Sequence, residues 1–380
     1  MSGLDKDRLG IVRVRRYFEM DRRQLLKGAA AFGAAALVGR ALPAQAATKL
    51  NFVGWEGYDT FLEADDFVKN KGAELQKSYI SSADEVITKL RLGSGQVDIC
   101  TPYFIHDDFL ANDGLLEPLD LDKLPNFKGI HPTIKAMTEG NMSEGGKWYA
   151  APMTYGAICM VYNADKVAEP TSWTDMLKDE VKGKVAITAD YPGNLFAWAK
   201  VTGATKPNNM TKDELAKTVK ALVDLKKNHL RTIAPSYGDL INMLASGEVV
   251  MSQGWEPVSV WVGDKANIKV AYPKEKSMGF IEGYAIGKGS ANIDLAHEII
   301  NNALSVDGQL AGAEANSMPV VTSDAMAKAS DANKALYNYD KLDDYFNVKT
   351  EVVPMYPLEA DGTHATWDDY QAAWETVMKS

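Results

Sequence analysis

Strand-like and helix-like segments alternate along the chain from about residue 49, and this alternation constrains the fold more than any other feature. Apolar runs such as Lys49-Leu50-Asn51-Phe52-Val53 and Val97-Asp98-Ile99-Cys100-Thr101 are typical of buried strands. Thr211-Lys212-Asp213-Glu214 is a capping box that opens an amphipathic helix to about His229. The alternation predicts an α/β fold with mixed, largely parallel sheets.

The chain is long enough for two lobes, and nothing in it resembles a flexible linker. It has 380 residues, of which 46% are hydrophobic and 24% charged, as in ordinary globular proteins. A chain of this length normally divides into two domains. We therefore predict two α/β lobes joined by short crossings, with a ligand cleft between them at the carboxyl ends of strands.

The N-terminal segment has the pattern of an export signal. Arg22-Arg23 precedes a small, apolar run from Gly28 to Gly39, and Ala44-Gln45-Ala46 fits a cleavage site. The paired arginines favour the twin-arginine route, and Met20 is an alternative start. A membrane anchor is the alternative interpretation, but about 12 residues are fewer than the ~20 needed to span a bilayer. Residues 1–46 are thus predicted to be removed, leaving a periplasmic protein.

The predicted mature chain is strongly acidic. Residues 1–46 contain nine of the 41 basic and four of the 51 acidic residues, so 32 basic and 47 acidic residues remain, a net charge near −15. Such a surface repels nucleic acid and anionic membranes and favours cationic solutes. A lipid anchor requires a cysteine directly at the cleavage site, and none stands there, so no lipid anchor is predicted. Cys100 and Cys159 lie in apolar runs and are interpreted as buried free thiols, although a disulfide stays open.

Motifs for catalysis, cofactors or metals are not found in the sequence. It has no dinucleotide-binding or phosphate-binding glycine loop, no nucleophile elbow and no clustered metal ligands among its five histidines. His106 beside Asp107-Asp108 is interpreted as a solvated helix start. We therefore expect a protein that is not an enzyme and that needs no cofactor or metal.

Aromatic residues cluster where predicted strands end, often beside an acid. The clusters are Trp55-Glu56-Gly57-Tyr58, Thr101-Pro102-Tyr103-Phe104, Gly254-Trp255-Glu256-Pro257 and, within a strand, Phe280-Ile281-Glu282-Gly283-Tyr284. An aromatic face attracts a desolvated cation by ~0.5–2 kcal/mol, and carboxylates pair with N–H donors. For any one tryptophan, core packing is the better explanation, because tryptophan is highly buried on average. Their repetition at strand ends favours a site for an organic cation.

The sequence resembles the periplasmic spermidine/putrescine-binding proteins of ABC importers. The resemblance covers about residues 49–380 and is carried by landmarks in a shared order. These are Val53–Tyr58, Val97–Pro102, Gly114–Leu119, Lys123–Pro125, Tyr149–Pro152, Val161–Asn163, Tyr237–Asp239, Ala245–Glu248 and Gly254-Trp255. It implies a two-lobed type II periplasmic binding protein fold, with residues 47–150 and 279–322 in lobe 1 and residues 151–278 and 323–380 in lobe 2. It also implies transport of a polyamine as a monomer, with an ABC transporter permease and ATPase as partners.

The resemblance also implies which residues meet the ligand. Trp55 and Tyr58 resemble the family's N-lobe aromatic pair, Trp255 its platform in the other lobe, and Glu282 stands where the family has an amine-binding aspartate. Four further candidates are Glu56, Tyr103, Tyr155 and Glu256, all close to these motifs.

The chain departs from the family pattern at several positions, and one departure bears directly on the ligand. In Asp190-Tyr191-Pro192-Gly193-Asn194, Asn194 or Gly193 replaces a family carboxylate. A lost carboxylate leaves a quaternary ammonium, sulfonium or betaine-like cation as the alternative ligand, because such a cation has no N–H to donate. A secreted enzyme is the third hypothesis.

Overall fold

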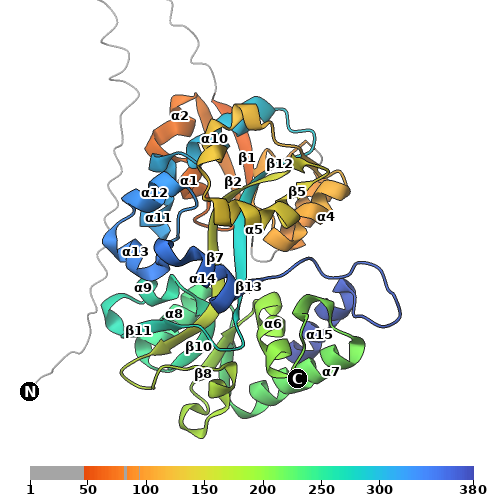
Figure 1. Cartoon of the computed structure of the whole chain (residues 1–380), viewed down its shortest axis with the longest axis vertical. Coiled ribbons are helices and arrows are strands. Elements are labelled where there is room, and N and C mark those ends of the chain that lie inside the picture. Colours follow the sequence, from red (N-terminus) through yellow and green to blue (C-terminus); the bar gives the residue numbers. More distant parts are fainter. Residues whose placement is uncertain (1–46, 81–83, 94) are drawn as a thin grey trace, which may run out of the picture. The chain divides into compact units, whose positions relative to one another are not determined.

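The computed structural model describes residues 47–80, 84–93 and 95–380 (Figure 1). The described residues belong to one compact unit, Ala47–Ser380. The predicted export signal in residues 1–46 lies outside the described residues. So does Ser82, which opens a second capping-box pattern, Ser82-Ala83-Asp84-Glu85, in the sequence. Within the part of the chain that is described, no helix is both long and apolar enough to span a bilayer.

The strands form one mixed sheet and a small hairpin. The strands of the main sheet are β1 (Thr48–Gly54), β2 (Ala73–Tyr79), β3 (Ile99–Cys100), β4 (Leu116–Glu117), β7 (Ala150–Asn163), β8 (Val185–Thr188), β9 (Leu230–Ala234), β10 (Met251–Trp255), β11 (Ile268–Ala271), β12 (Ser277–Gly287) and β13 (Thr350–Val352). Over the described residues their order is β2-β1-β3-β12-β7-β10-β8-β9, with β11 beside β7 and with β4 and β13 beside β12. The hairpin pairs β5 (Ser143–Glu144) with β6 (Lys147–Trp148).

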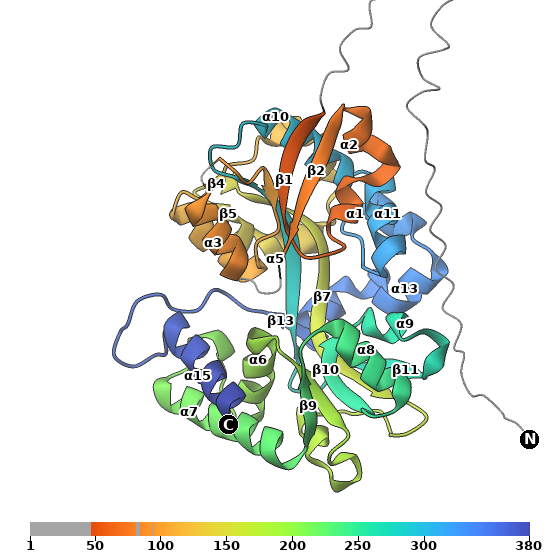
Figure 2. The same cartoon turned by 180° about the vertical axis from the view of Figure 1, so that it is seen from behind.

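Two long antiparallel strands, β7 and β12, connect the two lobes. They pair from Met278 opposite Ile158 to Ala285 opposite Ala150. Every residue of both strands is buried, as expected for strands covered on both faces. Figures 1 and 2 show them running between one group of elements around β1 and β2 and another around β8 and β9. The predicted two-lobed α/β fold is confirmed, and its lobes share one continuous sheet.

Parallel pairing joins strands within each lobe, and it also joins β13 to β12. In lobe 1, β1 is parallel to both β2 and β3. In lobe 2, β8 is parallel to both β9 and β10. The carboxyl ends of these strands are therefore where the loops with the predicted aromatic clusters begin, which positions the candidate site.

Helices cover the sheet in both lobes. Those grouped with β1 and β2 are α1 (Asp59–Leu62), α2 (Phe67–Asn70), α3 (Asp84–Leu92), α4 (Asp107–Asn112), α5 (Pro132–Met142), α10 (Ile293–Ala303), α11 (Val306–Asn316), α12 (Ser323–Lys328) and α13 (Asp331–Tyr337). Those grouped with β8 and β9 are α6 (Tyr191–Val201), α7 (Lys212–Asn228), α8 (Tyr237–Ser246), α9 (Val258–Trp261) and α15 (Trp367–Lys379). Helix α14 (Leu342–Asp344) precedes β13, and the predicted capping box of Thr211 and Glu214 caps α7 as expected.

The packing of α12 and α13 bears on the lobe boundary near residue 322. Helix α12 packs against α11, and the Asn333 side chain of α13 donates a 2.8 Å hydrogen bond to the Met318 carbonyl. Segment 323–337 therefore packs with the end of the chain assigned to lobe 1. This packing favours a last crossing between lobes at about 345–352, where β13 pairs with β12.

Two local predictions differ from the structure. In the sequence, Asp59 or Thr60 as a cap and Gly72 as a stop predict one helix, but the structure breaks it between α1 and α2, where Asp65 and Asp66 have positive φ angles of 56° and 54°. Strand β2 was not predicted from its sequence, because only Ala73 and Leu75 are buried in it and the polar run Gln76-Lys77-Ser78 interrupts the alternation typical of a strand. The two cysteines, in contrast, are buried and free, as predicted.

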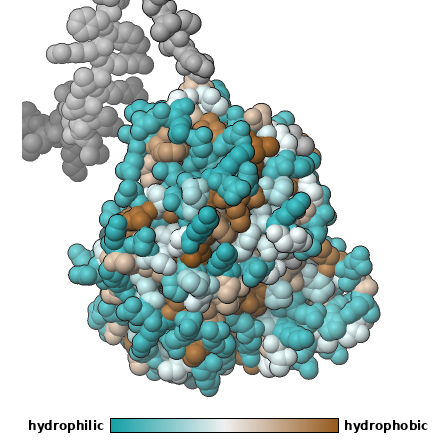
Figure 3. All heavy atoms as spheres, turned by 45° about the horizontal axis from the view of Figure 1, so that its top comes forward, coloured by the Kyte–Doolittle hydropathy of each residue, from teal (hydrophilic) through white to brown (hydrophobic). Residues whose placement is uncertain are grey.

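One face of the protein surface is predominantly polar. On the face drawn in Figure 3, hydrophilic residues predominate and hydrophobic ones lie among them. Among the described residues, the exposed large hydrophobic side chains come from separate elements: Tyr79, Leu92, Val260, Val348, Leu358 and Met378. Scattered apolar residues of this kind are normal for a soluble surface.

Candidate ligand-binding site

The predicted aromatic and acidic residues lie on two different faces of the sheet. Opposed residues of an antiparallel pair point to the same face, and neighbours along a strand point to opposite faces. Trp255, Phe280 and Glu282 each pair with an even-numbered residue of β7, so they share one face, here called the binding face. The Trp255 and Phe280 rings are in contact, with centroids 5.7 Å apart.

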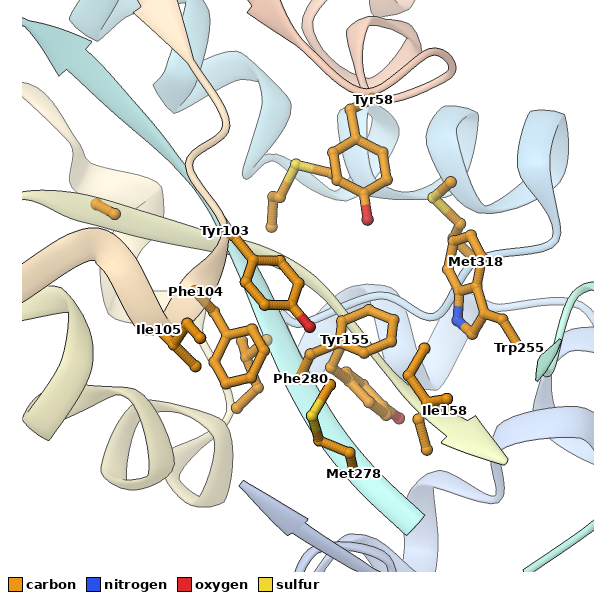
Figure 4. Close-up of a cluster of buried hydrophobic side chains, with 14 of the residues drawn as sticks. Tyr58, Tyr103, Phe104, Ile105, Tyr155, Ile158, Trp255, Met278, Phe280 and Met318 are labelled. Carbon is orange, nitrogen blue, oxygen red and sulfur yellow. The ribbon is translucent and has the colours of Figure 1, made fainter. Parts of the chain in front are cut away.

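Two tyrosines of lobe 1 reach this face from loops that follow strands. Tyr58 lies after β1, and its carbonyl accepts a 2.5 Å hydrogen bond from the Tyr284 hydroxyl of β12. Tyr103 lies after β3. Figure 4 shows Tyr58, Tyr103 and Trp255 gathered around one region, with both hydroxyl groups and the indole nitrogen turned toward the group. None of these three side chains is more than 8% exposed, so the two lobes close over them.

Two carboxylates near this group, Glu282 and Asp190, lie within electrostatic range of each other. Glu282 is 2% exposed, and its Oε2 atom has no hydrogen-bond partner. Burial and then the nearby Asp190 carboxylate raise the pKa of Glu282 well above its usual range. Asp190 is the N-cap of α6, where its Oδ2 accepts a 3.2 Å hydrogen bond from the Gly193 backbone N–H. Burial of its carboxyl group raises the pKa of Asp190 to about 6.

Sequence reasoning named Asp190 only as part of a turn and did not propose it as a ligand residue. Its position directly after β8, at the start of a helix, was the available signal, because the carboxyl ends of strands meet at the site. Tyr237 was also missed; its ring lies 6.3 Å from that of Trp255. The sequence prediction relied on acids and aromatic residues beside a tryptophan, and neither Asp190 nor Tyr237 has a tryptophan beside it in the sequence.

The structure places Tyr155 and Glu256 on the opposite face. Tyr155 packs against the Tyr345 and Phe346 rings at centroid distances of 5.4 and 5.3 Å. Glu256 is fully buried, and its oxygens accept hydrogen bonds from the backbone N–H of Ala157 and from the hydroxyls of Tyr272 and Tyr345 at 2.7–3.1 Å. Glu256 follows Trp255 directly, so it points away from the binding face. These hydrogen bonds hold Glu256 in the packing on that face, and its contact with a ligand stays a prediction.

The remaining predicted residues are less closely tied to the group. The Asn194 amide donates hydrogen bonds to the Thr188 and Asp190 carbonyls, 2.8 and 2.7 Å away, and thus fastens the start of α6, while its Oδ1 stays unpartnered. Trp55 is half-buried and Glu56 is exposed, both in the loop that carries Tyr58. Nothing in the structure links Trp55 or Glu56 to the carboxylates.

A second set of contacts joins the lobes beside Tyr103. The His106 ring of lobe 1 lies 5.1 Å from the Trp367 ring of α15 in lobe 2. The Trp367 indole also donates a 3.1 Å hydrogen bond to the Tyr191 hydroxyl. Nearby, the Gln371 amide donates a 2.8 Å hydrogen bond to Asp84 of α3. These contacts stabilise the closed arrangement of the lobes without being part of the binding face.

The interpretation of His106 as a solvated helix start is wrong. The residue is 1% exposed, both ring nitrogens lack hydrogen-bond partners, and burial lowers its pKa from 6.5 to about 3. The Tyr103 ring beside it is three residues away, but the Trp367 ring comes from a distant part of the chain, and this contact leaves no local sequence signal.

A His106→Phe variant is expected to lose acid sensitivity. Below pH 6.5 the unfolded chain binds a proton at His106 and the folded chain does not, so the free energy of unfolding falls by up to about 1.4 kcal/mol per pH unit down to about pH 3. Urea unfolding gives the free energy of unfolding of the wild-type and variant proteins at each pH between 7 and 4. The difference between their two slopes against pH is the contribution of His106. Equal slopes would show that His106 does not titrate in this way.

The fold and the site together define a solute-binding protein, with two lobes closed over a buried group of rings and carboxylates. Residues 64–338 match the family model of bacterial extracellular solute-binding proteins. The chain belongs to this family, which is a family of transport proteins and not of enzymes. Residues 19–39 match the twin-arginine translocation signal sequence, which confirms the predicted export to the periplasm.

Curated relatives and solved structures extend this result. The chain is 28% identical over 249 residues to spermidine/putrescine-binding periplasmic protein 1 of Haemophilus influenzae, covering 63% of this chain and 66% of that one. It is 28% identical over 284 residues to the spermidine/putrescine-binding periplasmic protein of Escherichia coli, covering 73% and 78%. The spermidine/putrescine ABC transporter substrate-binding protein PotD of Streptococcus pneumoniae superimposes with a TM-score of 0.68 at 21% identity, covering 88% and 98%. The structural likeness shows the fold, and the relatives confirm the resemblance found in the sequence.

Proposed function

We propose that this protein binds a polyamine of the putrescine or spermidine type between its lobes and delivers it, as a monomer, to the permease and ATPase of an ABC importer. The observation that carries the proposal is the buried Glu282 carboxylate together with the half-buried Asp190 carboxylate, whose charge acts on it. Among the salt bridges of the described residues, none involves either carboxylate. Buried carboxylates without a counter-charge are costly, and a ligand ammonium group supplies that charge.

The aromatic residues suit the rest of such a ligand. Tyr58, Tyr103 and Trp255 gather around one region (Figure 4), and both tyrosines lie within electrostatic range of Glu282. Their ring faces attract a desolvated cation while packing against methylene groups. Ligand contacts made by both lobes stabilise the closed arrangement, so binding shifts the population toward the form that the permease is proposed to recognise. Trp55 and Glu56 stay candidates at the edge of this region.

The carboxylate pair weighs against a quaternary ammonium or sulfonium ligand. Such a cation has no N–H to donate, so the free Oε2 of Glu282 would stay without a hydrogen bond. The named relatives, which bind spermidine and putrescine, also favour a polyamine for this chain.

Calorimetric titration of the mature protein tests the function directly. We expect putrescine or spermidine to bind with a dissociation constant well below 1 mM, and choline and glycine betaine to bind far more weakly. Absence of polyamine binding in the submillimolar range, with a folded protein, would overturn the proposal.

Polyamine binding is expected to weaken below pH 6. The unliganded site holds Asp190 with a pKa of about 6 and Glu282 with a raised pKa, whereas a bound ammonium group favours both ionised forms. Binding at pH 6 must therefore release protons, and affinity falls by up to about tenfold per pH unit for each proton released. Calorimetry in two buffers with different ionisation enthalpies counts these protons. An identical binding enthalpy in both buffers at pH 6 would contradict the prediction.

A further inference from the structure

Beside the carboxylates, the described part of the binding face contains two buried hydrogen-bond donors that have no acceptor. Trp255 Nε1 and Gln253 Nε2 are both buried without a hydrogen-bond partner. The orientation of the Gln253 amide is fixed, because its Oε1 accepts 3.0 and 2.6 Å hydrogen bonds from the backbone N–H and the hydroxyl of Thr188. An indole N–H and an amide NH₂ can only donate.

Both donors lie at the candidate site itself. Gln253 and Trp255 are two residues apart on β10, so their side chains share the binding face. A Cβ atom on Gly193 would stand 2.5 Å from Asp190 Oδ2 and 3.0 Å from Gln253 Nε2, which places that donor near the Asp190 carboxylate. Figure 4 shows the indole nitrogen of Trp255 on the edge of the ring nearest the other labelled side chains.

An unmodified polyamine does not satisfy these groups. At neutral pH its nitrogens are protonated and have no lone pair, so each can donate to Glu282 and Asp190 but none can accept from Trp255 or Gln253. A buried donor left unpaired costs about 1–3 kcal/mol. A ligand with a carbonyl oxygen removes that cost for at least one donor.

We propose that the preferred ligand is a diamine or polyamine with one nitrogen acylated, a refinement that rests on the function proposed above. Its free ammonium group pairs with Glu282 and Asp190, and its amide carbonyl accepts from Trp255 Nε1 or Gln253 Nε2. The amide N–H finds an acceptor in the Tyr103 hydroxyl, which is also buried and unpartnered. The site thereby discriminates between the two ends of one ligand.

The test compares putrescine with N-acetylputrescine, and spermidine with N1-acetylspermidine, by calorimetry at pH 7.5. In at least one of the two pairs, wild-type protein is expected to bind the acetylated compound about tenfold more tightly than the unmodified amine. The reason is that its carbonyl oxygen satisfies one buried donor. Trp255→Phe keeps an aromatic ring and removes the N–H, and Gln253→Glu keeps the acceptor for Thr188 and removes the NH₂. At least one variant is expected to lose the preference.

The possible outcomes distinguish failure of this inference from failure of the proposed polyamine binding. Equal or tighter binding of both unmodified amines by wild-type protein overturns the inference and leaves polyamine binding intact. A preference that survives in both folded variants also overturns it, because neither donor is then responsible. Failure of all four amines to bind overturns the proposed function, and the inference with it. A Trp255→Phe variant that does not fold leaves Gln253→Glu to decide.

Discussion

A Glu282→Gln variant is expected to bind putrescine or spermidine about a hundredfold more weakly than wild-type protein. The substitution keeps the side chain's shape but removes the charge and one of its two acceptor oxygens. A hydrogen bond to a charged group contributes about 1.5–3 kcal/mol, and at this depth little water competes for the ligand ammonium. The loss shows in calorimetric titrations of the two proteins at pH 7.5.

Folding is not expected to suffer from the same change. Glu282 Oε2 has no partner within the protein, and the Asp190 carboxylate opposes its ionisation. Removing a buried acid in such surroundings leaves the free energy of unfolding unchanged or raises it by about 1 kcal/mol. A variant that binds polyamine normally, or one that is strongly destabilised, would show that Glu282 belongs to the packing and not to the site.

A matched control separates local from general electrostatic effects. Glu74→Gln removes one negative charge from the exposed side of β2, away from the binding face. Long-range attraction between an acidic protein and a cation is screened beyond about 10 Å at ordinary salt concentrations. We expect affinity to change less than twofold in this control, so a large effect at Glu282 cannot be assigned to net charge.

The sequence was sufficient to predict the fold because the necessary signals are local. Thr211 and Glu214 cap α7 through neighbouring backbone groups, and the apolar runs of β1 and β8 need only their own residues to be recognised. Helix α1 breaks early because Asp65 and Asp66 adopt left-handed backbone angles, which local propensity does not reveal. The single sheet depends on the pairing of β7 with β12, more than 100 residues apart in the chain.

The site was predicted only in part, because adjacency along a strand is misleading. A tryptophan followed directly by a glutamate suggested a joint site, but the side chains of Trp255 and Glu256 point to opposite faces. Side chains two residues apart on a strand share a face, so Gln253 is the neighbour of Trp255 on the binding face and Phe280 is the neighbour of Glu282. Asp190 needed tertiary information, since only the closed lobes bring it near Glu282.

Glu256 connects three segments that lie far apart in the sequence. Its oxygens accept hydrogen bonds from the backbone of β7, from Tyr272 after β11 and from Tyr345 ahead of β13. β7 runs between the lobes, and Tyr345 belongs to the last crossing that the packing favours. Burial raises the pKa of Glu256, while these hydrogen bonds lower it and so favour the ionised form.

A Glu256→Ala variant is accordingly expected to lose about 3–5 kcal/mol of unfolding free energy, since it leaves two tyrosine hydroxyls and one backbone N–H unpaired around a new cavity. Tyr345→Phe removes one of these hydrogen bonds and is expected to cost only about 1 kcal/mol. Urea unfolding of both variants measures the losses, and calorimetry on the folded fraction of Glu256→Ala is expected to find polyamine affinity within a few fold of wild type. An affinity loss comparable to that of Glu282→Gln would place Glu256 in the binding site after all, because a carboxylate on the far face of the sheet has no direct contact to lose.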